Sequence, residues 1–389
     1  MLLACAGGAA ACSSDGGPAA ASGSAGSAGA GGLPQAGSSA GGSGGTAGGA
    51  NASAGTAGGG QTPSTAGSAG VGSGGTPGTA GTSGAGDTAG AGGAVVQPGL
   101  VATPSELAFG AVQKTASGPQ TVMLTNPSAQ AVQLMSTTLD AAAADTPMFE
   151  LVSGPQAGTQ IAAGNSTTVQ LRFHPGSVAT FKSKLVVQTA NPAAKLEIGL
   201  YGLGTKGLEG ENEPFLKPVL DTLGFNIDVG GAGLLSTTTP LVGSEVAAPR
   251  FKAASAAEVE LVPVARYSPQ EPIPYGYYSG ASATETQVGI IADDQYQALN
   301  PKTDAGSKKS FAAPTGEFGI FTTSKTHKTY TEDAKNAGNA TKHAVRTYPL
   351  KDRAGAAIPN GYLVCFEEAA NGDYQDYVFT LRNVTPVAP

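Results

Sequence analysis

The chain of 389 residues has no tryptophan, three cysteines, 6% aromatic residues and 13% charged residues, whereas soluble domains carry about 25% charged residues. Such a composition is not that of a single globular domain. No run of about 18 or more apolar residues is present, so the sequence predicts no transmembrane helix. The net charge of -7 leaves no basic surface for nucleic acid or for an anionic membrane.

The first quarter of the chain lacks almost everything that a folded core needs. Residues 1–95 contain no lysine, arginine or aromatic residue, and their only acids are Asp15 and Asp87. Residues 13–97 are near-repeats of Gly, Ser, Ala and Thr, which bury too little apolar surface to offset the entropy of ordering them. They are predicted to be a disordered linker with an end-to-end distance of about 50 Å. An accidental low-complexity tail is the alternative.

Residues 1–12 contain two cysteines that each follow small or apolar residues, in Leu-Leu-Ala-Cys and Ala-Ala-Ala-Cys. These segments resemble the end of a bacterial lipoprotein signal, which implies that Cys5 or Cys12 receives a lipid. A basic region and an apolar region of signal-peptide length are missing, so we expect the first Met to lie inside a longer signal. An ordinary part of the Ala/Gly-rich tail is the alternative. The resemblance implies a protein that is secreted or lipid-anchored at the bacterial outer membrane or cell surface.

Residues 98–205 show the pattern of half-buried β-strands. Val169, Leu171 and Phe173 alternate with polar residues, and this period of two is typical of a strand with one buried face. Further strands are expected at 120–125, 184–189 and 195–200. Several short strands without a helical period between them predict an antiparallel β-sandwich.

Sequence landmarks of this segment resemble those of the Hydin/ASH group of immunoglobulin-like domains, known in bacteria as choice-of-anchor D. In order they are Pro-Ser-Glu-Leu-Ala-Phe-Gly at 104–110, Leu-Thr-Asn-Pro at 124–127, Phe149, Ile-Ala-Ala-Gly-Asn-Ser at 161–166, Phe-His-Pro at 173–175 and Leu-Tyr-Gly-Leu-Gly at 200–204. Phe109 and Phe173 are expected in the core, and Asn126 in a turn. The resemblance implies a scaffolding or adhesion module without a catalytic set.

Residues 211–389 are predicted to form a second β-sandwich, jelly-roll-like and again mostly antiparallel. A short helix is expected first, because Leu216, Leu220 and Leu223 lie on one helical face. Strand-like runs then follow at 258–264, 287–291, 318–321, 343–348, 362–366 and 377–381. The fold class is therefore all-β, with two sandwich domains after the linker.

Four carboxylates lie close together near the C-terminus, at Glu367, Glu368, Asp373 and Asp376. They flank an Asn-Gly turn between two predicted strands, where hard oxygen ligands could converge on Ca²⁺. The spacing is not that of an EF-hand, and a solvated acidic hairpin is the alternative. The segment also resembles the closing motif of secreted bacterial β-sandwich domains of unknown function, with Glu368 in place of the usual Asp and Gln375 in place of the usual Asn. Both changes keep an oxygen donor.

A second candidate surface is the proline-containing segment 267–278, which holds Tyr267, Tyr275, Tyr277 and Tyr278. Exposed tyrosine rings suit stacking on sugars or on partner side chains. The alternative is that half or more of these rings belong to the core.

Signals for catalysis are weak. The three histidines lack the spacing of a zinc motif, and Gly-x-Ser-x-Gly matches occur only in the linker. Carboxylate pairs for glycoside hydrolysis could come from Asp293, Asp294, Glu332 and Asp333, but their separation cannot be read from the sequence. Cys365 is expected to be a buried free thiol.

The sequence therefore predicts a non-catalytic cell-surface lipoprotein whose β-sandwich domains bind protein or carbohydrate, with Ca²⁺ as a candidate stabilising ion. A purely structural envelope module is the first alternative. A hydrolase in the C-terminal domain is the second.

Overall fold

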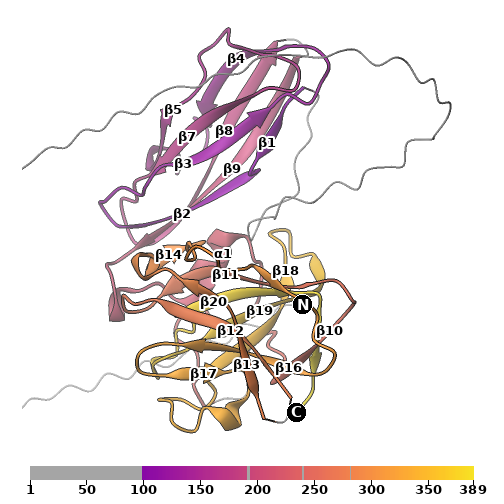
Figure 1. Ribbon diagram of the computed structural model, residues 1–389. Coiled ribbons are helices and arrows are strands. Elements are labelled where there is room, and N and C mark those ends of the chain that lie inside the picture. The colour runs from indigo at the N-terminus through magenta and orange to yellow at the C-terminus, as the bar shows by residue number, and fades with distance from the viewer. Residues whose placement is uncertain (1–98, 191–192, 239–240, 281) are drawn as a thin grey trace, which may run out of the picture. The chain divides into compact units, whose positions relative to one another are not determined.

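The computed structural model describes residues 99–190, 193–238, 241–280 and 282–389, and strands dominate them (Figure 1). The predicted lipoprotein signal with Cys5 and Cys12, and the predicted linker at 13–97, lie outside these residues. The α-helix among them is α1, Leu216–Leu223. In the described part of the chain no helix has the length and apolar character needed to cross a membrane.

The first domain is a sandwich of two sheets. One sheet has the strand order β1 (Val101–Thr103), β3 (Gln120–Thr125), β7 (Ser166–Phe173), β5 (Phe149–Ser153). The other has the order β2 (Glu106–Val112), β9 (Ala193–Thr205), β8 (Ala179–Ala190), β4 (Val132–Leu139), β6 (Gln160–Ile161), and a 3-10 turn, η1 (Thr146–Met148), precedes β5. All pairs are antiparallel except β2 and β9, which run parallel from Glu106↔Gly199 to Val112↔Thr205.

Alternating side chains of these strands build the core between the two sheets. On β7, Val169, Leu171 and Phe173 are fully buried, as their period of two predicts, and each buried side chain of this size contributes about 1.5–3 kcal/mol. The Phe173 ring lies 6.2 Å from that of Phe109, centre to centre. A Cβ added at Gly202 of β9 would lie 2.2 Å from the Phe173 ring. Glycine is needed there because the ring packs directly on the β9 backbone.

The turn residue Asn126 is also buried, and its side-chain amide forms hydrogen bonds with the backbone. Its Nδ2 donates to the carbonyl oxygens of Gln130, at 2.7 Å, and Ile161, at 2.9 Å. Its Oδ1 accepts the N–H of Ser128 at 3.0 Å. The side chain thus holds the turn after β3 to the β6 strand.

The second domain begins with helix α1, which follows the 3-10 turn η2 (Gly210–Asn212). Leu216, Leu220 and Leu223 are buried in one core cluster, as their spacing predicts, and Leu203 from the end of β9 belongs to the same cluster. The helix ends at Gly224, which has a left-handed φ of 87° and donates its N–H to carbonyls of the last turn. The end of β9 therefore contributes to the core of the second domain.

Two antiparallel sheets form the body of this domain. The first has the order β13 (Thr284–Ile291), β12 (Ile273–Ser279), β16 (Phe318–Thr323), β10 (Arg250–Ala253), β21 (Val384–Val387), with β17 (Lys328–Tyr330) paired to β16. The second has the order β14 (Gln297–Leu299), β11 (Val259–Tyr267), β20 (Tyr377–Arg382), β19 (Ala357–Phe366), β18 (Val345–Lys351), with β15 (Ser310–Phe311) paired to β11. Two 3-10 turns, η3 (Asp293–Gln295) and η4 (Asp333–Lys335), lie in the connections. The all-β prediction is confirmed.

Candidate functional site

The acidic segment predicted from the sequence is the loop 367–376, which connects β19 to β20. These strands are central in their sheet, between β11 and β18, and their pairing ends at Phe366↔Tyr377. The loop therefore leaves the middle of a sheet rather than its edge. It is also held from outside, because the Leu235 N–H donates to the Gly372 carbonyl at 2.6 Å.

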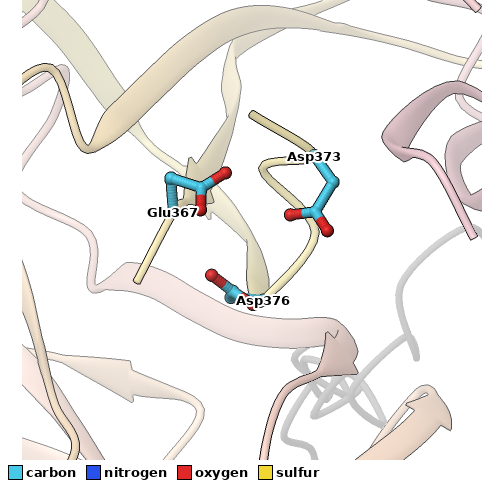
Figure 2. A group of neighbouring side chains, drawn as sticks. All are labelled: Glu367, Asp373 and Asp376. Atoms are coloured by element: carbon cyan, nitrogen blue, oxygen red, sulfur yellow. The ribbon is translucent and has the colours of Figure 1, made fainter. Parts of the chain in front are cut away.

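Three of its carboxylates converge (Figure 2). One oxygen each of Glu367, Asp373 and Asp376 lies within 4.8 Å of the other two. The residues are only 1%, 5% and 5% exposed. The alternative of a solvated acidic hairpin is therefore wrong, because these groups are removed from water.

Hydrogen bonds within the loop fix the three groups but leave oxygens free. Glu367 Oε2 accepts the N–H groups of Gly372, at 3.0 Å, and Tyr374, at 3.2 Å. Asp376 Oδ2 accepts the N–H of Glu368, and Asn371 Nδ2 donates to Asp373 Oδ2 at 2.8 Å. Among the described residues, no hydrogen-bond donor reaches Glu367 Oε1 or Asp373 Oδ1, although both atoms are buried.

Burial and mutual repulsion destabilise the ionised form of these three carboxyl groups. Burial raises the pKa of Glu367, and the charge of Asp373 raises it further, against the opposing N–H groups of Tyr374 and Gly372. Burial likewise raises the pKa of Asp373 and of Asp376. Buried carboxylates this close need either protons or a cation to balance their charge.

Glu368, the fourth predicted ligand, lies outside the group. It is half-buried, and its carboxylate accepts hydrogen bonds from the hydroxyls of Tyr377 and, at 3.0 Å, Thr326. The two neighbouring glutamates point to different partners, so Glu368 is corrected from a ligand to a residue that braces the loop.

Two residues beside the cluster, Gln375 and Glu213, were not predicted to be ligands. Gln375 is fully buried, and its Oε1 receives no hydrogen bond. Its Nε2 lies 3.5 Å from Oε2 of Glu213, whose Oε1 accepts a hydrogen bond from Gln297 Nε2 at 2.5 Å. Burial raises the pKa of Glu213 to about 7. A separation of 162 residues between Glu213 and Gln375 left no sequence signal for this contact.

The predicted tyrosine surface is wrong. Tyr267, Tyr275 and Tyr278 are buried, and Tyr277 is half-buried with its ring stacked on Phe311 at 4.3 Å between centres. These residues lie in β11 and β12, and core side chains cover their rings; the Tyr275 ring, for example, lies 5.1 Å from that of Phe379 on β20 of the other sheet. The reading in which most of them are core residues is the correct one.

The other candidates from the sequence have ordinary structural surroundings. Asp293 and Asp294 are exposed on η3, and Glu332 accepts a hydrogen bond from Arg250 Nε at 3.0 Å. Asp333 accepts one from His343 Nδ1 at 2.9 Å. Cys365 is a buried free thiol, as predicted.

A cavity of about 340 Å³ lies beside His343 and was not predicted. His343 Nε2 lies 3.0 Å from Oε1 of Glu245, which also accepts a hydrogen bond from Arg346. Burial alone would lower the pKa of His343, but hydrogen bonds to Asp333 and Glu245 outweigh it and raise the pKa to about 9. The imidazole is thus a cation between two carboxylates, and its nitrogens are occupied.

Comparison with known families assigns the first domain. Residues 97–205 match the family model described as Cep192 domain 4. This part of the chain is an ASH-like domain of the immunoglobulin type. None of the curated proteins compared with the chain matches it.

Solved structures give only distant likenesses. The human CEP192 ASH/PapD-like domain 7 is 11% identical, with a TM-score of 0.23, over 29% of this chain and 91% of its own. WR4, a C. elegans MSP family member, is 13% identical, with a TM-score of 0.20, over 27% of this chain and 96% of its own. The secreted serine protease VesC of Vibrio cholerae is 11% identical, with a TM-score of 0.21, and the match spans 72% of this chain but 48% of VesC. TM-scores this low carry no functional argument.

Proposed function

We propose that this protein is a non-catalytic binding protein of the bacterial cell surface, whose C-terminal β-sandwich is stabilised by one bound Ca²⁺. The observation that carries the proposal is the convergence of Glu367, Asp373 and Asp376 in a buried loop with free carboxylate oxygens. The ASH-like domain suggests a protein-interaction module, and this supports the proposed binding role.

The spacing of the carboxylates suits calcium. Two oxygens that each bind Ca²⁺ at about 2.4 Å can lie at most about 4.8 Å apart, and the three groups meet this limit. Calcium takes six to eight oxygens in irregular geometry, so Gln375 Oε1 and loop carbonyls are available as further ligands. The donor set contains no histidine and no cysteine, which disfavours zinc.

Charge favours a divalent cation over protons alone. Three ionised carboxylates would place three negative charges in a site that has no adjacent free cation among its described neighbours; Arg346, near Tyr374, already donates to Glu245. A bound Ca²⁺ would offset most of this charge and occupy the free oxygens. Because the loop joins two central strands, the ion would stabilise the whole sheet.

The partner is proposed to be a protein. Carbohydrate binding rested on exposed tyrosines, but three of the four are buried and the fourth, Tyr277, is stacked on Phe311. Adhesion through a protein partner is consistent with the ASH-like module, while lipid attachment at Cys5 or Cys12 and the linker would display that module away from the membrane.

The test of the calcium site is thermal unfolding of the full chain with Ca²⁺ and with EDTA. A site that binds only the native state adds about 2.7 kcal/mol at a calcium concentration of about 100 times Kd, which raises Tm by several degrees. Asp376→Asn should lose this shift, and in EDTA it should be no less stable than the wild type because a buried carboxyl that must be kept neutral is replaced by a neutral amide. Asp293→Asn, on an exposed carboxylate, should keep the shift. An equal Tm with and without Ca²⁺ in the wild type would overturn the proposal.

The test of the binding role uses a surface-display comparison. Cells that display the full chain should capture partner proteins from envelope extracts, and an excess of the soluble ASH-like domain, whose core cluster lies within its own sequence, should compete this capture away. Equal capture with and without the competitor would contradict a role of the ASH-like domain.

A further inference from the structure

Glu213 occupies a special position in the chain. It follows η2 in the segment 206–215, which connects β9 of the ASH-like domain to α1 of the second domain. Most of this segment before it is exposed, including Lys206, Leu208 and Glu211. Glu213 is half-buried, and Gln297 Nε2 donates to it at 2.5 Å. Glu213 thus fixes the end of an exposed connecting segment by a hydrogen bond.

Glu213 also contacts the acidic loop. Gln375 Nε2 lies 3.5 Å from Glu213 Oε2, and Gln375 stands between Asp373 and Asp376 in the chain. Gln375 is fully buried, and its Oε1 receives no hydrogen bond. Its backbone carbonyl accepts the Tyr267 N–H at 3.3 Å, and its two flanking carboxylates are residues that a cation would draw together.

We propose that calcium at the three-carboxylate site locks the connecting segment 206–215 through the contact between Gln375 and Glu213. This inference rests on the proposed calcium site and adds a role for it. Without the ion, Asp373 and Asp376 are held by separate hydrogen bonds, from Asn371 Nδ2 and from the Glu368 N–H, and share no common centre. With the ion, the loop has one arrangement, and the Gln375 amide is presented to Glu213 in a fixed position.

The expected result of this coupling is that Ca²⁺ protects a region that lies outside its own site. At about pH 8, above the pKa of about 7 that burial gives Glu213, the hydrogen bond to its carboxylate should suppress local opening about tenfold. Glu213 is the acceptor from both Gln297 and Gln375, so its loss should free the segment while the three calcium ligands stay in place. Glu213 is a positioning residue in this scheme, since it acts through Gln375.

The test is limited trypsin digestion of the full chain at Lys206, with Ca²⁺ or EDTA, together with Tm on the same samples. In the wild type, Ca²⁺ should slow cleavage at Lys206 about tenfold. Glu213→Gln should lose most of this protection but keep the calcium-dependent rise in Tm. Glu211→Gln, which removes an exposed carboxylate two residues earlier, should keep both.

The outcomes separate the two claims. Equal protection in Glu213→Gln and the wild type would overturn the coupling while leaving the calcium site. No rise in Tm with Ca²⁺ in the wild type would overturn both. Hydrogen exchange of the wild type guards against a variant that fails to fold: Ca²⁺ should slow exchange of the amides at 206–212, and unchanged exchange there would also overturn the coupling.

Discussion

The guanidinium of Arg346 lies 4.6 Å from the centre of the Tyr374 ring. Tyr374 belongs to the acidic loop, and its N–H donates to Glu367, so a buried cation packs against a residue of the proposed calcium site. This cation is already used, because Arg346 donates to the buried carboxylate of Glu245 and to the carbonyl of Ser236. The second domain therefore contains two charge clusters. In one, Arg346 balances the carboxylate of Glu245; in the other, three carboxylates converge without an adjacent free cation among the described residues.

Arg346→Leu is expected to destabilise the protein by about 3–5 kcal/mol, because it leaves the Glu245 carboxylate buried without its main cation. Urea unfolding of the full chain would measure this loss. Lys302→Ala, on an exposed side chain, should change stability by less than about 0.5 kcal/mol. A loss below about 1 kcal/mol in Arg346→Leu would mean that His343 alone balances Glu245.

Stability in EDTA is expected to fall as the pH rises from about 5 to about 8. The native protein holds protons on Glu367, Asp373 and Asp376, whose pKa values are raised by burial, at pH values where the unfolded chain has lost them. Each step up in pH therefore favours the unfolded state. Saturating Ca²⁺ should remove this fall, because the ion replaces the protons. Urea unfolding across this pH range, with and without Ca²⁺, tests it, and parallel curves would count against metal binding.

A second pH effect is expected at His343. Its pKa is raised to about 9 in the native protein from an ordinary value of about 6.5, so its stabilising charge is fully present below about pH 6.5 and is lost as the pH rises through about 9. His343→Gln should cost at most about 3 kcal/mol at pH 6 and little above pH 9.5. His174→Gln, on an exposed ring paired with Glu150, is the control and should cost less than about 0.5 kcal/mol. The NMR titration of the two rings gives an independent reading; an ordinary pKa at His343 would contradict the ion-pair geometry.

Gly202→Ala is expected to destabilise the ASH-like domain by about 1–3 kcal/mol. The new methyl group would lie 2.2 Å from the Phe173 ring, so the ring or the strand must move. Gly118→Ala meets nothing within 4 Å and should be neutral or slightly stabilising. Thermal unfolding compares the two, and an equal Tm would show that Phe173 has room to shift.

Much of the fold could be predicted because the strands carry their own pattern. β3 has the predicted bounds, and on β7 the alternation along Val169, Leu171 and Phe173 reflects one buried face. The tyrosines failed because both faces of β12 are covered. Tyr275 and Tyr277 alternate into the core cluster between the sheets, while Tyr278 packs edge-on against Tyr330 of β17. Proline and tyrosine composition alone then indicated a loop.

The candidate site was predicted in part. Glu367, Asp373 and Asp376 are close in sequence, and the Asn-Gly turn brings them together, so their proximity could be read from the chain. The orientation of Glu368 could not be predicted. The end of β19 is buried on both faces, so an alternation of buried and exposed residues does not extend into the loop and does not show which way Glu368 points. Contacts such as Glu245 with His343, 98 residues apart, depend on the tertiary fold and leave no local pattern.

The parallel pairing of β2 with β9 has a mechanical consequence. A tension that enters the chain before β2 and leaves it after β9 pulls two parallel strands in opposite directions along their length, so their interstrand hydrogen bonds between Glu106↔Gly199 and Val112↔Thr205 are loaded in shear and must break together. Antiparallel neighbours pulled from one end would unzip pair by pair at lower force. A module built in this way resists rupture when it is stretched between an anchor and a bound partner.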